Sequence, residues 1–248
     1  MEGNQPPRRT SWPWQNAPKP DTTLCDHADR ERLYTANPNF GSVVSYPSRC
    51  QAWGDSRYRG NCDGTLFKEL LLRYRPKTVA DPMMGSGTTR DVVRGINRHL
   101  RTDIHFFGAD LRTGFDLERD PLPGPFEFIW LHPPYWDIVR YSQADPRDLS
   151  QTAEWPDFCM RLSACLLRCA GALTPGGHLA VLVGDIRKRG RYYSMAAELL
   201  SHRGAFGELR AILIKEQHHC TSDRKTYAPF VDPPIRHEYC LLFRRPSA

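Results

Sequence analysis

Two short segments of the chain combine residue types and spacings that can do chemistry. In the first, DPMMGSGTT, Asp81 precedes a turn that contains Gly85 and Gly87. Glycines permit a tight turn and a close approach of ligand to backbone, and the carboxylate can accept hydrogen bonds from a ligand ammonium group. In the second, HPPYW, His132 precedes two prolines and Tyr135. Consecutive prolines hold the backbone stiff and extended, and the tyrosine ring offers a face on which a planar base can stack.

Each segment also has an ordinary structural interpretation, because glycine turns join many strands to helices and a Pro-Pro-aromatic run can be a packed turn. No lysine follows the glycines at the spacing of a P-loop, which excludes that phosphate site. Asp110 ends the next predicted strand, where an acid can bind ribose hydroxyls, although it can equally cap a turn. Ser86, Thr88 and Thr89 are expected to cap the helix that follows the glycines. The joint occurrence of these features favours a nucleotide-type pocket.

The elements that must position these segments alternate along the chain. The apolar patterns predict strands over 78–82, 103–110, 126–131, 178–185, 209–217 and 237–245, and helices over 65–74, 88–100, 152–173 and 192–203. This order predicts an α/β, Rossmann-like fold: a mostly parallel seven-stranded sheet with an antiparallel last strand and helices on both faces. Ligands of such sheets bind beyond the carboxyl ends of the strands, where both segments lie.

Length and composition suit one globular domain. The chain has 248 residues, of which 40% are hydrophobic and 25% charged, so a disordered chain is excluded. Residues 1–24 are expected to form a disordered, proline-rich tail, and 25–248 a single catalytic domain whose segment 25–60 wraps over the surface. No apolar run reaches the ~18 residues of a membrane helix, and the N-terminus lacks the apolar stretch of a secretory signal. A cytoplasmic protein with reduced cysteines is therefore expected.

The two segments together resemble the cofactor and catalytic motifs of the DNA amino-methyltransferases, which use S-adenosylmethionine to methylate adenine N6 or cytosine N4. The resemblance runs from about Gly60 to Arg245 and includes GNCDGTLFKELLLRY, PKTVADPMMGSGTT, GADLRTGFDL and HEYCLLFRRP. It implies a class I methyltransferase fold. It also implies a role for two sets of residues. The cofactor would be bound by Asn61, Thr65, Asp81, Pro82, Gly85, Gly87, Thr88, Asp110 and Asp116, with Asp120 as the alternative to Asp116. The flipped base would be held by His132, Pro133, Pro134 and Tyr135.

The resemblance implies that the first motif residue and the next proline carbonyl accept hydrogen bonds from the two amine hydrogens of the base. That positions the nitrogen lone pair toward the methyl group. The family carries Asp, Asn or Ser at the first position, whereas this chain carries His132. A neutral imidazole still accepts through one ring nitrogen, and a protonated one does not. Adenine N6 is favoured over cytosine N4, although histidine decides neither.

Basic and aromatic residues near the motifs are candidates for contact with nucleic acid. The net charge is +6, and the candidate substrate-binding residues are Trp136, Arg140, Tyr141, Arg187, Lys188, Arg189, Arg191, Arg224 and Lys225. Solvated basic turns are the alternative. No separate target-recognition domain is evident, so specificity is low, is read by loops or residues 1–60, or comes from a second chain or homodimer. Metal is not expected, because the spacing of the Cys and His residues fits no zinc pattern.

The main hypothesis is a site-specific or low-specificity DNA methyltransferase of a bacterium, phage or mobile element, with or without a restriction partner. Two alternatives stay open at this stage. One is an RNA base methyltransferase, which differs in its recognition of the 2′-hydroxyl. The other is a regulatory subunit that binds S-adenosylmethionine or DNA and is catalytically impaired by the histidine.

Overall fold

The computed structural model describes residues 33–218 and 232–247, and the predicted tail at 1–24 lies outside them. The strands are β1 (Val43–Ser45), β2 (Thr78–Asp81), β3 (His105–Gly108), β4 (Phe126–Leu131), β5 (Leu173–Val183), β6 (Ile186–Lys188), β7 (Arg191–Tyr193), β8 (Glu208–Glu216) and β9 (His237–Arg244). The helices are α2 (Thr65–Tyr74), α3 (Thr88–Leu100), α4 (Trp155–Gly171) and α5 (Met195–Ser201), with short 3-10 turns at Leu111–Thr113, Leu149–Gln151 and Arg203–Ala205. None of these helices is long and apolar enough to cross a membrane.

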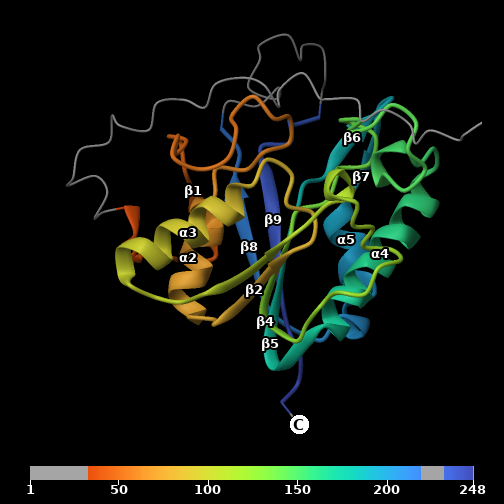
Figure 1. The fold of residues 1–248 in the computed structure, drawn as a ribbon. Helices are drawn as coiled ribbons and strands as arrows, with labels where there is room; N and C mark the ends of the chain where they lie inside the picture. The colour runs from red at the N-terminus through yellow and green to blue at the C-terminus, as the bar shows by residue number, and fades with distance from the viewer. Residues whose placement is uncertain (1–32, 219–231, 248) are drawn as a thin grey trace, which may run out of the picture.

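Seven strands form one sheet in the order β1-β8-β9-β5-β4-β2-β3. β9 runs antiparallel to both neighbours, β5 and β8, and the remaining pairs are parallel. Helices α2 and α3 cover one face of the sheet and α4 and α5 cover the other (Figure 1). The predicted fold, a mostly parallel Rossmann-like sheet with an antiparallel last strand and helices on both faces, is confirmed.

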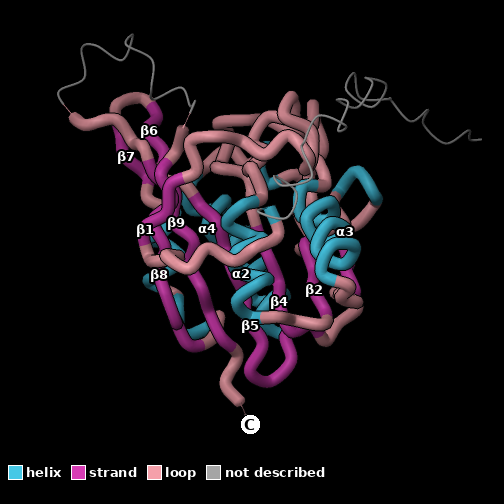
Figure 2. Tube along the Cα trace, turned by 90° about the vertical axis from the view of Figure 1, so that its left-hand side faces the viewer, coloured by secondary structure: helices cyan, strands magenta, loops and turns pink. Residues whose placement is uncertain are grey.

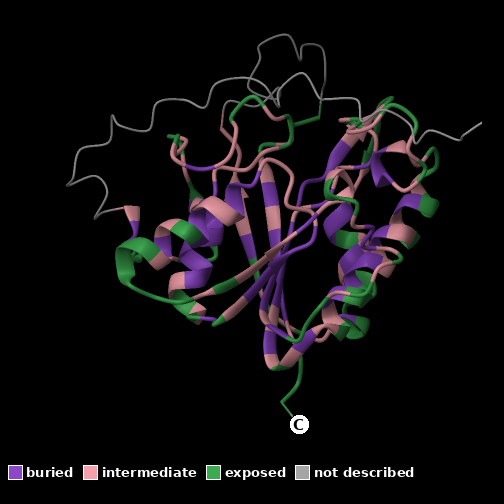
Figure 3. Cartoon of the chain, in the orientation of Figure 1, coloured by how far each residue is buried: buried purple, intermediate pink, exposed green. Residues whose placement is uncertain are grey.

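The sheet separates two apolar cores, and β4 contributes to both. Phe128 and Trp130 pack in the core that contains α2 and α3, whereas Ile129 and Leu131 pack in the core that contains α4 and α5. Successive side chains of a strand point to opposite faces, so an almost continuous apolar run is what a strand buried on both faces requires. Figure 3 shows the strands as the most completely buried layer of the molecule.

The segment 25–60 was expected to wrap over the surface, and its described part does so except at one strand and a few buried anchors. Val43–Ser45 pairs in parallel with β8 and supplies the seventh strand. Trp53 and Tyr34 are 1% and 7% exposed and belong to the core of α2 and α3. Their rings are anchors that attach this segment to the domain.

Two predicted helices are shorter than expected. The helix predicted over 152–173 spans Trp155–Gly171, because Leu149–Gln151 forms a separate 3-10 turn before it. The helix predicted over 192–203 begins at Met195, where Ser194 accepts a hydrogen bond from the Ala197 N–H. Tyr192 and Tyr193 instead belong to the β6–β7 hairpin, which lies at the same end of the molecule as the loops at the carboxyl edge of the sheet (Figure 2).

Candidate active site

Two neighbouring cavities lie at the carboxyl edge of the sheet. The first has a volume of about 520 Å³ and is lined by residues of both motifs, including Asp81, Gly85 and His132. The second has a volume of about 630 Å³ and lies toward β8 and β9. His132, Tyr58 and Tyr141 line both cavities, and the two tyrosine rings stack with centroids 5.7 Å apart. Two ligands, one in each cavity, would therefore both lie next to His132.

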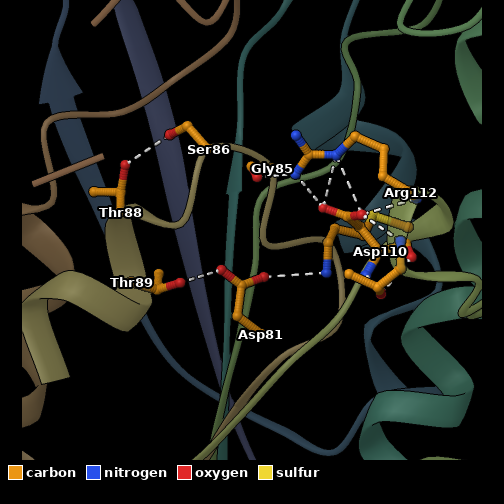
Figure 4. Close-up of polar contacts among 9 residues, drawn as sticks. Asp81, Gly85, Ser86, Thr88, Thr89, Asp110 and Arg112 are labelled. Atoms are coloured by element: carbon orange, nitrogen blue, oxygen red, sulfur yellow. Dashed lines mark hydrogen bonds and ion pairs between the residues drawn. The ribbon is translucent and has the colours of Figure 1, made fainter. Parts of the chain in front are cut away.

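Asp81 ends β2 in the first cavity and is 2% exposed. Its Oδ2 accepts a hydrogen bond from the Thr89 hydroxyl at 2.6 Å, and its Oδ1 accepts one from the Met83 N–H at 3.1 Å (Figure 4). Burial raises the pKa of this carboxyl to about 7, against the lowering effect of the two hydrogen bonds. No cation of the described chain pairs with it, so a ligand ammonium group would supply the missing charge.

The glycine turn leads directly into α3. Gly85 and Gly87 have φ values of 54° and 86°, a backbone region that glycine adopts without strain. Gly87 is the N-cap residue of α3, and no side chain caps the helix, so the expected capping by Ser86, Thr88 or Thr89 is wrong. The hydroxyls are used elsewhere: Thr89 bonds Asp81, and Thr88 donates to Asn61 Oδ1 at 2.5 Å. That second bond ties the segment before α2 to the cofactor motif.

Asp110 follows β3 and caps the turn Leu111–Thr113, where its carboxylate accepts the N–H groups of Arg112 and Thr113. The Arg112 guanidinium pairs with the same carboxylate and also donates to the Gly85 carbonyl (Figure 4). Arg112 lies over the Tyr58 ring at 5.3 Å from its centroid. Asp110 therefore caps a turn, as one interpretation expected, and it also lines the first cavity, where its binding of a ribose stays a prediction. Arg112 was not anticipated from the sequence.

Asp116 lines the first cavity and is 5% exposed. Its Oδ1 accepts the Glu118 N–H at 3.0 Å, whereas its buried Oδ2 has no hydrogen bond and lies 3.5 Å from Arg119 Nε. A buried acceptor without a donor is costly, and a ligand N–H would satisfy it. Asp120 instead accepts the Asp116 N–H at 2.7 Å and is not among the residues that line the cavity. This geometry favours Asp116 over Asp120.

The second motif follows β4, and its side chains contact a polar network that includes residues of β8 and β9. His132 Nε2 lies 3.0 Å from the Tyr135 hydroxyl, which donates to Glu238 Oε1 at 2.6 Å. Lys215 on β8 donates to Glu238 Oε2 at 2.7 Å. Burial lowers the pKa of His132 despite the nearby Glu238 carboxylate. The imidazole is therefore neutral at pH 7 and able to accept a hydrogen bond.

The structure brings most of the predicted cofactor residues together and leaves two outside. The first cavity is lined by Asn61, Asp81, Pro82, Gly85, Thr88, Asp110 and Asp116. Thr65 and Gly87 line neither cavity, because Thr65 begins α2 and Gly87 caps α3. Of the catalytic motif, Pro134 lines the first cavity and Pro133 and Tyr135 line the second.

Only some of the residues predicted to contact the substrate line a cavity. Arg140 and Tyr141 line the first cavity, whereas Trp136 is buried and donates to the Thr152 carbonyl at 2.8 Å. The basic residues Arg187, Lys188, Arg189 and Arg191 lie on the β6–β7 hairpin and line neither cavity. Lys188 pairs with Asp137 and lies 3.8 Å from the Trp136 ring centroid. Arg224 and Lys225 lie outside the described residues.

Sequence reasoning missed several residues of the second cavity. Glu238 and Lys215 are charged positions that directly adjoin the apolar runs of their strands, a pattern that could have marked them. Tyr46 and Arg49 also line this cavity, and the Tyr46 hydroxyl and Arg49 Nε are buried without a hydrogen-bond partner among the described residues. Both atoms are hydrogen-bond donors. Among the described residues, no group of three or more His, Cys, Asp or Glu side chains could hold a metal ion.

Comparison with known proteins gave structural similarity without a family assignment. No family model matches the chain, and no curated protein matches it. It is similar to TTHA0409 of Thermus thermophilus, whose proposed identity is a DNA modification methylase and which was crystallised with S-adenosyl-L-methionine. The identity is 23% over 53% of this chain and 52% of that chain, with a TM-score of 0.37. The chain thus spans about half the length of the TTHA0409 structures.

Two further structures match over more of the chain. The N-methyltransferase NodS of Bradyrhizobium japonicum WM9 is 13% identical over 71% of this chain and 90% of that chain, with a TM-score of 0.41. The [4+2]-cyclase SpnF is 13% identical over 81% of this chain and 88% of that chain, with a TM-score of 0.45.

Proposed function

We propose that the protein is an S-adenosylmethionine-dependent methyltransferase that modifies the exocyclic amine of a flipped DNA base, with adenine N6 favoured and cytosine N4 next. The observation that carries the proposal is the position of His132, a neutral hydrogen-bond acceptor that lines both a cofactor-sized cavity and a second cavity. A methyl donor and an amine acceptor must meet at one point, and the first residue of HPPYW occupies the wall that the cavities share.

The first cavity fits S-adenosylmethionine in charge and in hydrogen bonding. Asp81 is a buried carboxylate without a cationic partner among the described residues, which suits the ammonium of the methionine moiety. Asp116 Oδ2 is a buried acceptor that forms an ion pair with Arg119 but no hydrogen bond to any described residue, which suits an adenine amine. Asp110 would bind the ribose hydroxyls once its carboxylate is shared with, or released by, Arg112. The bound cofactor supplies a methyl group activated by a sulfonium.

The second cavity would receive the base. A base must leave its stack to reach such a pocket, and the stiff Pro133–Pro134 backbone would hold the loop that receives it. His132 and the Pro133 carbonyl would accept hydrogen bonds from the two amine hydrogens and so aim the nitrogen lone pair at the methyl group. The donors of Tyr46 and Arg49 would bind ring or carbonyl acceptors of the base.

The β6–β7 hairpin is the proposed contact with the phosphate backbone. Arg189 and Arg191 are exposed on this hairpin, which lies at the same end of the molecule as the loops at the carboxyl edge of the sheet (Figure 2). Guanidinium groups that neutralise phosphates provide affinity independent of sequence. In this proposal residues 25–248 act as one catalytic domain in the cytoplasm, and a second chain or homodimer can add target recognition.

The decisive experiment incubates the protein with tritiated S-adenosylmethionine and unmethylated genomic DNA, double- and single-stranded, beside total RNA. Digested nucleosides are then identified by mass spectrometry. We expect N6-methyladenine or N4-methylcytosine from DNA, and no label with the Asp81→Asn variant. Label in RNA alone would mean that the substrate is RNA and not DNA. Cofactor binding without transfer to any nucleic acid would support the regulatory-subunit alternative, which the His132→Asp variant tests by gain of activity.

A further inference from the structure

A chain of four polar side chains connects two strands of the sheet to the proposed acceptor of the amine. It runs from Lys215 on β8 through Glu238 on β9 to Tyr135 and His132 in the loop after β4, over contacts of 2.7, 2.6 and 3.0 Å. The Lys215 and Glu238 side chains are 12% and 10% exposed. The resemblance to a known family accounts for the motif residues but not for this connection.

The charges at the strand end of the chain fix the direction of its hydrogen bonds. Burial raises the pKa of Glu238, but Lys215, together with His132 and the hydrogen bond from Tyr135, outweighs that effect and keeps the pKa below its ordinary value. Glu238 likewise keeps the pKa of Lys215 raised against the effect of burial. The carboxylate is therefore ionised and can only accept. Burial, together with Glu238, raises the pKa of Tyr135, so the tyrosine keeps its proton and donates it to Glu238.

The same directionality extends to the imidazole. Because the Tyr135 proton is committed to Glu238, the tyrosine oxygen can only accept from His132 Nε2, which must carry a hydrogen. In a neutral imidazole the other nitrogen, Nδ1, then holds a lone pair. No described residue hydrogen-bonds Nδ1, whereas the ring as a whole lines both cavities.

We propose that Lys215, Glu238 and Tyr135 are positioning residues that hold neutral His132 as the Nε2–H tautomer, so that Nδ1 is the atom that accepts a hydrogen bond from the target amine. This rests on the proposed function for the identity of the amine. The chain explains how histidine can serve where the family carries Asp, Asn or Ser. A given ring nitrogen of a neutral histidine is an acceptor in only one of the two tautomers. The Lys215–Glu238 ion pair, acting through Tyr135, selects the tautomer in which Nδ1 is the acceptor.

The geometry around Tyr135 leaves little freedom for another arrangement. Gly184, directly after β5, packs against the ring, and a Cβ there would lie 2.5 Å from Tyr135 Cε2. The other titratable groups near this ring are Cys62 and Tyr141. Burial raises the pKa values of both, so they add no charge to the site at pH 7.

The test is nitrogen-15 NMR of the full chain labelled in histidine, without cofactor or nucleic acid. The His132 signals are assigned by their loss in His132→Gln. In the wild-type protein at pH 7.5 we expect a protonated Nε2 and an unprotonated Nδ1.

In Glu238→Gln, Lys215 still needs an acceptor and takes the amide oxygen, so the amide NH₂ faces Tyr135. Tyr135 must then donate to Nε2, and the His132 tautomer inverts to Nδ1–H. Glu208→Gln, an exposed acid of β8 paired with Arg210, is the matched control and keeps the wild-type pattern.

A wild-type His132 that is the Nδ1–H tautomer, or an imidazolium at pH 7.5, would overturn the inference. So would an unchanged tautomer in Glu238→Gln. Tyr135→Phe provides a second variant: it removes the acceptor of Nε2–H, and we expect both tautomers to appear. Tyr239→Phe on the same strand as Glu238 is its control and leaves the pattern intact.

The activity readout separates this inference from the proposed function. If methyl transfer is found, Glu238→Gln should lower kcat at least about tenfold, the equivalent of one buried hydrogen bond. Tyr135→Phe should lower kcat by a smaller factor, because part of its His132 keeps the active tautomer. Both variants should leave cofactor affinity unchanged. Loss of cofactor affinity with unchanged kcat would refute the positioning role. If the NMR pattern holds and no amine is methylated, the tautomer assignment stands while the proposed function fails.

Discussion

Replacing Asp81 by Asn should make the unliganded protein more stable and at the same time unable to bind its cofactor. The Asp81 carboxyl is buried without a cationic partner among the described residues, and its pKa is raised from 3.8 to about 7. Between these values the folded protein holds a proton that the unfolded chain has released, so stability falls as pH rises from about 4 to about 7 and is level above that. Each pKa unit corresponds to 1.36 kcal/mol, so the full cost of the charged carboxylate is ~4 kcal/mol.

The change of this free-energy cost with pH tests the reasoning more strictly than the absolute cost does. At pH 5 the cost is ~1.5 kcal/mol and at pH 8 it is ~4 kcal/mol, so the advantage of Asp81→Asn should grow by ~2–3 kcal/mol between these pH values. The difference is independent of how well the amide reproduces the bonds to Thr89 and Met83, since those are lost or kept equally at both pH values. An asparagine can keep both contacts by accepting from the Met83 N–H and donating to the Thr89 hydroxyl.

The assay is urea unfolding of the wild type, Asp81→Asn and Asp157→Asn at pH 5 and pH 8, followed by thermal unfolding with S-adenosylmethionine. Asp157 lies exposed in the first turn of α4, so its variant should follow the wild type at both pH values. The cofactor should raise the Tm of the wild type and of Asp157→Asn and leave that of Asp81→Asn unchanged. The reasoning is refuted if the gap between Asp81→Asn and the wild type does not widen from pH 5 to pH 8.

Three further predictions concern the cofactor, the proton and the nucleic acid. Asp116→Ala should weaken binding of S-adenosylmethionine about tenfold by calorimetry, because it removes the buried acceptor proposed for the adenine amine, and Asp120→Ala should change the affinity less. At saturating cofactor, kcat should be level at pH 7–8 and fall only below pH 6.5, because burial lowers the pKa of His132 from 6.5; a loss of kcat that already begins above pH 6.5 would contradict a neutral acceptor. The double variant Arg189→Ala/Arg191→Ala should weaken DNA binding equally across sequences and reduce the slope of log K against log salt by about 2; an unchanged slope would exclude the β6–β7 hairpin from phosphate contact.

Most of the sheet was predictable because its strands carry strong local patterns. Strands such as Phe126–Leu131 are apolar at nearly every position, and six of the seven sheet strands were located in this way. β1 was not located, since only Val44 of its three residues is buried. Its strand conformation comes from pairing with β8, more than 150 residues later in the chain. The β6–β7 hairpin was missed for a related reason: Tyr192 and Tyr193 run directly into the apolar pattern of α5.

The residues of the candidate site divide in the same way, into those that a local sequence pattern marks and those that only tertiary contacts reveal. Asp81, Gly85 and Asp110 were predicted because each lies at or just after the end of a strand, within a recognisable local motif. Arg112 and Glu238 were not, because their roles depend on contacts between segments distant in sequence: Arg112 reaches Gly85, and Glu238 reaches Tyr135. Local sequence specifies where a functional group can stand, and tertiary contact specifies its protonation state and hydrogen-bond direction.

That distinction bears on His132, which stands where the family that the sequence resembles carries an acid, an amide or a hydroxyl. A carboxylate accepts through either oxygen and needs no partner to define its acceptor. An imidazole needs a second group to decide which nitrogen carries the proton, and it must remain uncharged. Burial satisfies the second requirement by lowering the pKa of His132, and the Lys215–Glu238 pair, acting through Tyr135, satisfies the first. A His132→Asp variant would place a second carboxylate beside Glu238, with Lys215 as their shared counter-ion, and so would raise the pKa of one of the two. We therefore expect His132→Asp to be less active than the wild type and to recover activity only when Glu238 is also replaced by Gln.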